Sequence, residues 1–355
     1  TYRAMMKYPI GIQSFPDIRE RGFVYVDKTA FVYQMALMGK YYFLSRPRRF
    51  GKSLLVSTME AYFLGRKELF KGLAMEKLET EWKTYPVLHL DLNAQNYVDE
   101  NALHEELDKH LVIWEQTYGI AIDKSLSPET RFYNVIRNIY QQTGSQVVVL
   151  VDEYDKPLLS TIDNETLHTS YRNTLKAFFS VLKSLDACIR FAFITGVSKF
   201  SHVSIFSDLN NLNDVSMDAH YADICGISEQ ELHAYFDNSI HELADANGMT
   251  YEETCEQLRR QYDGYHFLQN SVGIYNPFSL LNTFAKGAFN DYWFATGTPT
   301  FLVKLLQQND YELSELQEIY VSASTLTSTN EDYDDPIPVL YQSGYLTIKG
   351  RDPYM

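Results

Sequence analysis

Apolar runs and amphipathic segments alternate along the chain up to residue 198. The runs are short and rich in branched side chains, which is typical of buried strands, and we expect strands at 41–45, 85–93, 146–152 and 188–198. Apolar residues at helical spacing predict helices at 101–118, 129–142 and 165–185. Because strands alternate with helices, we predict an α/β fold built on a parallel sheet.

The pattern changes beyond residue 225, where helical segments replace strands. Ser228-Glu229-Gln230-Glu231 and Thr250-Tyr251-Glu252-Glu253 both have the form of a capping box. In this motif the hydroxyl and the carboxylate each accept a hydrogen bond from a backbone N–H group that is otherwise free, so two helix starts are predicted. Another helix is expected at 300–307, after a break at Gly297-Thr298-Pro299.

The last part of the chain combines a polar stretch with a short apolar one. Residues 323–336 are rich in Ser, Thr and Asp and predict a loop. Residues 337–348 predict a short helix, a glycine turn and a strand, as in a small winged-helix-like cap. We therefore expect a core at 1–224, a helical lid at 225–310 and the cap at 311–355.

Composition narrows the class of protein. With 355 residues, 45% of them hydrophobic and 22% charged, the chain can form two or three globular domains. It has no apolar run near the roughly 18 residues of a membrane helix and no signal segment, so we expect a cytoplasmic protein with no membrane partner. Three widely spaced cysteines indicate neither a disulfide framework nor a zinc site. The net charge of −15 argues against non-specific coating of nucleic acid.

The segment 41–55 predicts a strand that turns through Gly51-Lys52-Ser53 into a helix, as in a phosphate-binding P-loop. In such a loop backbone N–H groups surround the phosphates, Lys52 reaches the β- and γ-phosphates, and the Ser53 hydroxyl binds Mg²⁺. Arg46 stands where the general pattern has glycine. The competing interpretation is an ordinary helix start, since Lys and Ser are common there. The expected nucleotide contacts are Arg46, Pro47, Arg48, Arg49, Phe50, Gly51, Lys52, Ser53 and Leu54.

A second chemical signal lies at the end of the apolar strand 147–151, which is followed by Asp152-Glu153-Tyr154-Asp155. Ligands of open α/β sheets bind at the carboxyl ends of the strands. We expect Asp152 to hold Mg²⁺ and Glu153 to polarise an attacking water, with Asp155 in a structural role. The alternative is a buried strand whose exit into solvent is acidic. Because the loop and the acidic strand each predict the other, together they indicate a site for a nucleoside triphosphate.

Two further groups are candidates for this site. Thr195 and Ser198 end the last predicted strand, and Thr195 or Ser198 is expected either to sense the γ-phosphate or to cap the next segment. The loop arginines are expected to neutralise phosphate charge or to fix the loop to acidic neighbours, and Arg49 is assigned to the developing charge on the γ-phosphate, a role Arg48 could share.

Motifs along almost the whole chain resemble the AAA-ATPase-like family, bacterial proteins in which a PD-(D/E)XK nuclease-like domain usually follows. They include Pro9-Ile10-Gly11-Ile12, Tyr25-Val26-Asp27-Lys28-Thr29, Arg46-Pro47-Arg48-Arg49-Phe50-Gly51-Lys52-Ser53, Asp152-Glu153-Tyr154-Asp155-Lys156-Pro157, Thr195-Gly196-Val197-Ser198, Tyr262-Asp263-Gly264-Tyr265, Tyr275-Asn276-Pro277 and Leu340-Tyr341-Gln342-Ser343-Gly344-Tyr345-Leu346. For the segment Tyr25-Val26-Asp27-Lys28-Thr29 the sequence suggests no chemical role.

The resemblance implies a P-loop ATPase core with a helical and winged-helix-like lid, and it makes Arg46 a usual residue of the loop. It also implies that Pro299 approaches the adenine, against the simpler interpretation of a proline that starts a helix. The chain ends at Met355, where the nuclease-like domain would begin, so we expect that domain, and any contact with DNA made through it, to be absent from these residues.

These features predict an ATP-binding, Mg²⁺-dependent ATPase module that hydrolyses slowly and acts as a conformational switch, controlling an attached effector. The alternative is a regulatory module that binds nucleotide without hydrolysis, which the lack of an identifiable arginine finger favours. A small-molecule kinase fits less well, because an Asp-Glu pair suits the activation of water. The choice of ATP over GTP rests on the resemblance, and no Asn-Lys-x-Asp motif for guanine is present. The protein partner is not predicted.

Overall fold

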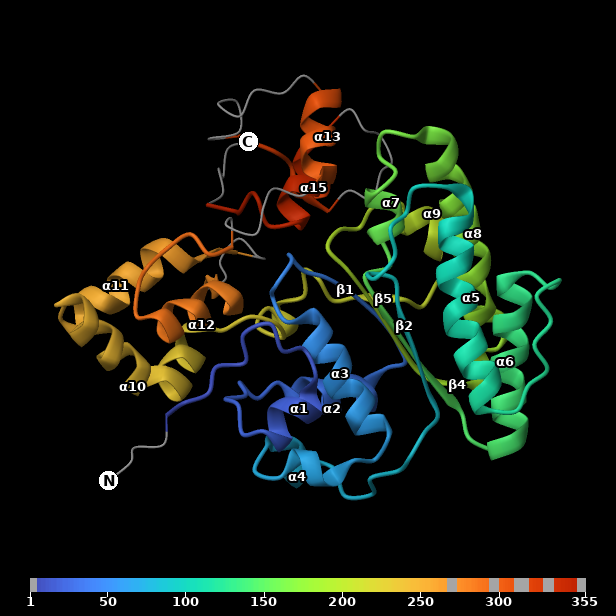
Figure 1. Cartoon of the computed structure of the whole chain (residues 1–355), viewed down its shortest axis with the longest axis horizontal. Helices are drawn as coiled ribbons and strands as arrows, with labels where there is room; N and C mark the ends of the chain where they lie inside the picture. Colours follow the sequence, from blue (N-terminus) through green and yellow to red (C-terminus); the bar gives the residue numbers. More distant parts are fainter. Residues whose placement is uncertain (1–4, 267–272, 294–299, 310–318, 328–334, 350–355) are drawn as a thin grey trace.

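The computed structural model describes residues 5–266, 273–293, 300–309, 319–327 and 335–349. Its centre is a sheet of five strands in the order β2-β3-β4-β1-β5, and every neighbouring pair is parallel. Helices lie on both sides of the sheet, with a separate group of helices beside it (Figure 1). The predicted α/β fold with a parallel sheet is therefore confirmed.

Four of the strands lie where the apolar runs predicted them. They are β1 (Tyr41–Ser45), β2 (Val87–Asp91), β3 (Val147–Asp152) and β4 (Ile189–Gly196). The fifth, β5 (Asn213–Asp214), was not predicted, because a strand of two residues is too short to show a pattern. Strand β4 lies between β1 and β3, so the segments that leave β1 and β3 emerge on either side of the end of β4.

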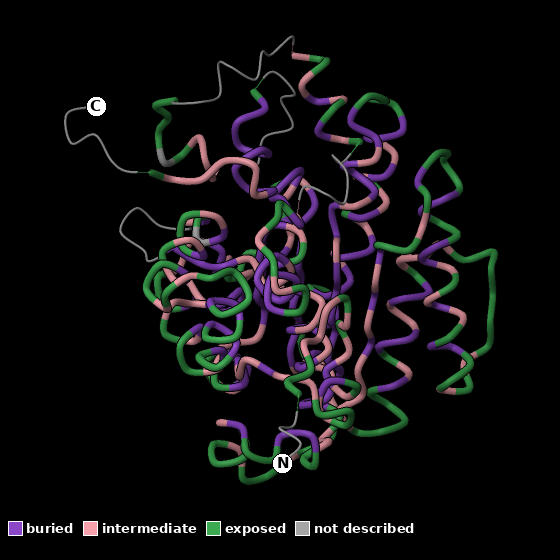
Figure 2. The backbone as a smooth tube through the Cα atoms, turned by 60° about the vertical axis from the view of Figure 1, so that its left-hand side comes forward, coloured by how far each residue is buried: buried purple, intermediate pink, exposed green. Residues whose placement is uncertain are grey.

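Alternate residues of each strand face opposite layers of helices. In β3, Val147, Val149 and Val151 belong to one hydrophobic cluster, and Val148 and Leu150 belong to another. The first cluster includes residues of α5 (Glu100–Thr117), α6 (Pro128–Thr143) and α8 (Glu165–Ser184); the second includes residues of α1 (Phe15–Glu20), α2 (Thr29–Met38), α3 (Lys52–Phe63) and α4 (Ala74–Leu78). Burial on both faces explains the uninterrupted apolar run. In Figure 2 the buried stretches of the backbone are concentrated in the middle of the molecule.

Short helices complete the core between these elements. They are η1 (Lys67–Phe70), α7 (Lys156–Leu159), η2 (Asp186–Cys188), α9 (His202–Phe206) and η3 (Ala219–Tyr221). In the described part of the chain, no helix carries an apolar stretch long enough to cross a membrane.

The lid consists of α10 (Glu229–Asn247), α11 (Tyr251–Tyr262) and α12 (Pro277–Lys286), which share a third hydrophobic cluster. Both predicted capping boxes form: Ser228 with Glu231, and Thr250 with Glu253. Two short antiparallel strands, β6 (Asp263–Tyr265) and β7 (Ile274–Tyr275), connect α11 to α12 and were not predicted. The N-terminal segment packs on this cluster through Tyr8, whose ring stacks on Phe236 and Phe284.

The C-terminal part differs from the prediction in two places. Helix α13 (Thr300–Gln308) forms as expected and is joined to the core by an ion pair of 2.9 Å between Lys304 and Asp163. Within the expected loop at 323–336, residues Ala323–Leu326 form the short helix α14, and 328–334 lie outside the described residues.

The strand expected after Gly344 is also absent, because residues 345–349 form no strand. Instead, the N–H groups of Tyr345 and Leu346 donate back to the Leu340 carbonyl, so the chain folds onto the end of α15 (Ile337–Gln342). The winged-helix-like cap and the domain limits at 224 and 310 remain predictions.

Candidate nucleotide-binding site

The loop between β1 and α3 reaches the start of the helix through two residues with left-handed backbone angles. Gly51 precedes the first residue of α3 and has φ 92°, a left-handed conformation that glycine adopts without strain. Arg49 is also left-handed, with φ 64°, which is uncommon for a residue that has a Cβ atom. The loop thus leads directly to the N-terminus of a 12-residue helix, whose free N–H groups and dipole favour an anion.

Lys52 lies at the centre of this loop. Its side chain is 3% exposed, and its Nζ donates to the carbonyl oxygens of Arg46 at 2.9 Å and of Pro47 at 3.0 Å. The same nitrogen lies 3.5 Å from the carboxylate of Glu153. Lys52 is therefore not an ordinary solvent-exposed lysine at a helix start. Its ammonium joins the loop after β1 to the acidic end of β3.

Thr195 organises the acidic end of β3. Its hydroxyl donates to the Asp152 carboxylate at 2.8 Å and accepts from the backbone N–H of Glu153 at 3.3 Å. Asp152 is 4% exposed, and Glu153 has φ 57°, a strained conformation for this residue. The hydroxyl of Thr195 therefore orients the acidic pair, and its role as a sensor of the γ-phosphate remains a prediction.

The environment of Glu153 favours its protonated form. Burial raises the pKa of this carboxyl group to about 7, more than the Lys52 ammonium lowers it, and the negative charges of Asp155 and Asp152 act in the same direction as burial. A carboxyl group with a pKa near neutrality can accept or release a proton at physiological pH. Such groups are concentrated at functional sites.

The carboxylate of Asp155 binds the backbone at the end of β4. It is fully buried and accepts from the N–H groups of Val197 at 3.3 Å and Ser198 at 2.8 Å, and from the Ser198 hydroxyl at 2.7 Å. These bonds fix the exit of β4 against the segment that follows β3. The Ser198 hydroxyl is thus engaged within the protein.

The loop arginines are placed differently from one another. The guanidinium group of Arg46 is buried and donates to the carbonyl oxygens of Ser45, Ser216 and Tyr221. It therefore braces the loop from within, and its contact with Lys52 is through its backbone carbonyl.

The guanidinium carbon of Arg49 lies 4.1 Å from the ring centre of Phe278 in α12, a cation–π contact between the loop and the lid. Desolvation, and secondarily the charge of Arg48, lowers the pKa of Arg49. In this conformation the expected role of Arg49 at the γ-phosphate would require it to leave Phe278.

Two segments near the C-terminus also contact the loop, and no sequence pattern predicted these contacts. The indole N–H of Trp293 donates to the carbonyl of Arg48 at 3.1 Å, and Gly344 lies so close to Pro47 that an added Cβ would be 2.6 Å from the proline side chain. The side-chain oxygen of Gln342 accepts from the N–H of Lys199 at 2.6 Å, just beyond the turn that Asp155 fixes. Gly344 belongs to one of the motifs shared with the family, but the motif does not indicate that its partner is Pro47.

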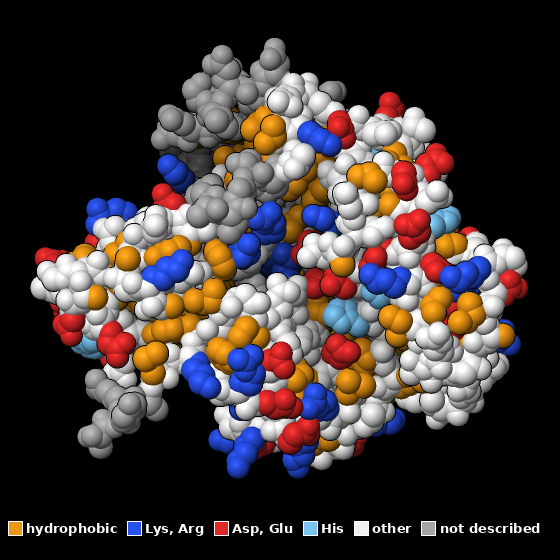
Figure 3. Space-filling model, in the orientation of Figure 1, with side chains coloured by type: hydrophobic (Ala, Val, Ile, Leu, Met, Phe, Trp, Pro, Cys, Tyr) orange, Lys and Arg blue, Asp and Glu red, His pale blue; other side chains and the backbone are white. Residues whose placement is uncertain are grey.

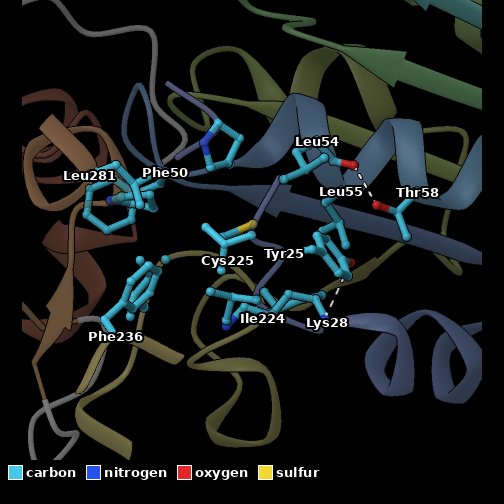
Figure 4. Close-up of a pocket in the computed structure, with 17 residues that line it drawn as sticks. Tyr25, Lys28, Phe50, Leu54, Leu55, Thr58, Ile224, Cys225, Phe236 and Leu281 are labelled. Carbon is cyan, nitrogen blue, oxygen red and sulfur yellow. Dashed lines mark hydrogen bonds between the residues drawn. The ribbon is translucent and has the colours of Figure 1, made fainter. Parts of the chain in front are cut away.

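A hollow lies near the middle of the face shown in Figure 3, with several Lys and Arg side chains on one side of it and Asp and Glu side chains on the other. Beside the loop is a small pocket that borders Phe50 and Gly51, with a cavity volume of about 90 Å³. Figure 4 shows its walls, which include Leu54 and Leu55 of α3, Phe236 and Leu281 of the lid, and Tyr25 and Cys225. The lining is mostly apolar, which suits a flat organic group such as a nucleobase.

Gly226 closes this pocket against the loop, and its substitution by alanine should be costly. Gly226 has φ 85°, its N–H donates to the Phe50 carbonyl at 3.0 Å, and an added Cβ would lie 2.2 Å from the Ile274 side chain. We expect Gly226→Ala to destabilise the protein by about 2–4 kcal/mol, from backbone strain and overpacking together.

Thermal unfolding measures this effect, and Gly248→Ala is the matched control. Gly248 has φ 62° but no atom within 4 Å of its added Cβ, so only the backbone strain of about 1 kcal/mol should appear there. Equal losses of stability in the two variants would contradict the close packing at Gly226.

Pro299, together with Gly297 and Thr298, lies outside the described residues. Its predicted approach to the adenine remains a prediction.

A parallel sheet in which β4 separates the loop strand from the acidic strand, with a buried lysine joining the two, defines the core of a P-loop nucleoside triphosphatase. A family model described as a predicted AAA-ATPase matches residues 9–206, more than half of the chain, and the chain belongs to this AAA-ATPase-like family. The chain is also 40% identical over 343 residues to a protein of Azotobacter chroococcum mcd 1 named "Uncharacterized protein in vnfD 5'region". That match covers 96% of this chain and 64% of the relative, so the chain spans less than two thirds of the relative's length.

Proposed function

We propose that this chain binds ATP with Mg²⁺, hydrolyses it slowly, and uses the nucleotide as a conformational switch for an attached effector. The observation that carries the proposal is the position of Lys52, buried between the loop carbonyls and Glu153 at the carboxyl edge of the sheet. A buried ammonium beside a helix N-terminus is suited to the β- and γ-phosphates of a triphosphate.

The ammonium of Lys52 is satisfied by the carbonyls of Arg46 and Pro47. A triphosphate would take over these hydrogen bonds, so Lys52 exchanges neutral acceptors for charged ones, which bind it more strongly. The free N–H groups at the start of α3 add further donors for the phosphates.

Ser53 and Asp152 fit a magnesium site. A hydroxyl and a carboxylate are the hard oxygen ligands that Mg²⁺ prefers, and Asp152 is held in place by Thr195. When bound, Mg²⁺ would neutralise charge on the phosphates. Asp152 ends β3 and Ser53 lies in the first turn of α3, which follows β1, so both residues lie at the carboxyl edge of the sheet with β4 between their strands.

Glu153 is the group that would orient and deprotonate the attacking water. It is the carboxylate nearest to Lys52, and its pKa near neutrality allows it to hold the proton that the water loses. Release of Arg49 from Phe278 would bring a positive charge toward the γ-phosphate. The pocket beside Phe50 and Gly51 would hold the adenine, with the triphosphate extending into the loop.

One observation favours the alternative of a module that binds without turnover. Arg46 and Arg49 are engaged by the protein itself, Arg46 by carbonyl groups and Arg49 by Phe278. With both guanidinium groups held in this way, the charge that develops on the γ-phosphate during hydrolysis is less stabilised. Hydrolysis is therefore expected to be slow.

Two measurements on the purified protein test the proposal. Calorimetry with Mg-ATP should show saturable binding, and steady-state phosphate release should show slow turnover, with and without DNA. Binding without phosphate release would support the regulatory module. Absence of binding to both ATP and inorganic tripolyphosphate would contradict the assignment of the loop.

We also predict that this chain does not cut DNA and binds it weakly at physiological salt. The charge of −15 opposes binding to a polyanion, and the sequence has no second group of carboxylates and lysine for a nuclease metal. Incubation with plasmid and short duplexes in Mg²⁺ or Mn²⁺ tests this. Cleavage that survives Lys52→Ala and Asp152→Ala would reveal a nuclease site within these residues. Contact with DNA through a further domain and the cytoplasmic location remain predictions.

A further inference from the structure

The segment Tyr25-Val26-Asp27-Lys28-Thr29 lies between the core and the lid, along one wall of the pocket beside the loop. Tyr25 and Lys28 both line this pocket, and the Tyr25 hydroxyl accepts from the N–H of Lys28 at 3.4 Å (Figure 4). The mechanism proposed above gives none of these residues a role.

Asp27 ties the segment to the core. Its carboxylate accepts from the N–H of Thr29 at 2.9 Å, from the Thr29 hydroxyl at 2.6 Å, and from the N–H of Ala74 at 2.8 Å. Thr29 and Ala74 are the first residues of α2 and α4. The carboxylate therefore holds the starts of two core helices, where a negative charge is favourable.

Lys28, the next residue, ties the segment to the lid. Its ammonium donates to both carboxylate oxygens of Glu231, at 2.7 and 2.9 Å, and to the carbonyl of Asp223 at 2.6 Å. The side chains of Lys28 and Glu231 are only 10% and 18% exposed, so solvent screens this pair weakly.

Glu231 is also the residue that completes the capping box of α10, where it accepts from the N–H of Ser228. A second contact joins the same elements, because the N–H of Asp27 donates to the hydroxyl of Tyr235 at 3.2 Å. The ion pair therefore acts on the first turns of the lid helix that carries Phe236.

The two tied elements form facing walls of the pocket. Figure 4 shows Lys28 and Tyr25 on one side and Phe236 and Leu281, from α10 and α12, on another. The ion pair of Lys28 with Glu231 thus fixes α10 relative to the core at the edge of the pocket. Gly51 lines this pocket, whereas Lys52, the next residue, does not.

We propose that Asp27 and Lys28 are positioning residues that hold the lid at the correct distance across the pocket, and so set the affinity for the nucleoside end of the nucleotide. They do so without contacting the phosphates. This inference rests on the proposed function, since it assigns the pocket to the nucleoside of ATP.

The test compares two probes, Mg-ATP and Mg-tripolyphosphate, by calorimetry. In Lys28→Met the apolar stem remains but the ion pair is lost, and we expect ATP affinity to fall on the order of tenfold or more, as is typical of coupling between linked parts of a protein. The affinity for tripolyphosphate should stay within about twofold of that of the wild type. Hydrogen exchange should also increase in the first turns of α10.

Three further variants keep the test decisive. Glu231→Gln preserves an oxygen acceptor for Ser228 and should give the same selective loss of ATP affinity, even where Lys28→Met folds poorly. Lys28→Arg, which can still bind a carboxylate through two hydrogen bonds, should restore the affinity. The matched control is Lys304→Met, which breaks the ion pair with Asp163 away from the pocket and should leave both affinities unchanged.

The outcomes separate this inference from the proposed function. A wild-type protein that binds neither probe contradicts the nucleotide site itself. Wild-type binding with unchanged ATP affinity in Lys28→Met and Glu231→Gln overturns the positioning role alone. Equal losses for ATP and tripolyphosphate also overturn it, because the pair would then act on the phosphate loop or on folding in general.

Discussion

Substitution of Lys52 by alanine should lower the affinity for Mg-ATP by at least about 100-fold, because a hydrogen bond to a charged group contributes about 1.5–3 kcal/mol and Lys52 can donate more than one. Tripolyphosphate binding should fall by a similar factor, since both ligands present the same phosphates. Calorimetry with each ligand measures the effect.

The matched control is Lys199→Ala. Lys199 is another buried lysine, but its ammonium pairs with Asp214 at 2.7 Å and not with the loop. Its loss should reduce thermal stability while ATP affinity stays close to that of the wild type. Equal ATP affinity in the wild type and Lys52→Ala would show that the loop does not bind phosphate.

Substitution of Glu153 by glutamine should preserve the binding of Mg-ATP and lower phosphate release by about 10²–10⁴-fold, the usual contribution of a general base. The amide keeps the shape of the side chain but cannot accept the proton of the attacking water. Single-turnover phosphate release measures the chemical step.

Asp152→Ala should instead lose affinity and Mg²⁺ dependence together, because it removes a proposed ligand of the metal.

The same variant should change how stability depends on pH. Burial raises the pKa of Glu153 from its usual value to about 7, so the folded protein holds a proton there that the unfolded chain has already released. The charged carboxylate therefore costs stability increasingly as the pH rises from about 4.5 to 7.

In Glu153→Gln this cost is absent. We expect the variant to be more stable than the wild type above pH 7, on the order of 2 kcal/mol, and the difference to vanish near pH 4.5. Thermal unfolding of the protein without added nucleotide, across this pH range, measures the difference in stability.

Glu115→Gln is the control, because Glu115 is a buried carboxylate that pairs with Arg131 far from the loop. The Glu115→Gln variant should lose stability at pH 8 and hydrolyse ATP at the wild-type rate. If Glu153→Gln also hydrolysed ATP at the wild-type rate, another group would activate the water.

The sequence by itself determined four of the five strands of the core sheet, the loop and the acidic pair. The run 147–151 is apolar throughout because both faces of its strand are covered, and burial of this kind is visible in composition alone. The turn at Gly51 and the capping boxes at Ser228 and Thr250 could likewise be predicted, since their hydrogen bonds or backbone angles involve neighbours in the chain.

Only the tertiary structure decided how these pieces meet. The ion pair of Lys28 with Glu231, the guanidinium of Arg46 against the carbonyl of Tyr221, and the contact of Gly344 with Pro47 join positions far apart in the chain. No local pattern encodes such pairs, because side-chain periodicity reports which face of an element is buried and not what covers it. The roles of Lys28 and Arg46 therefore follow from the order of the strands and the placement of the lid, which bring together residues whose own neighbours in sequence give no sign of their partners.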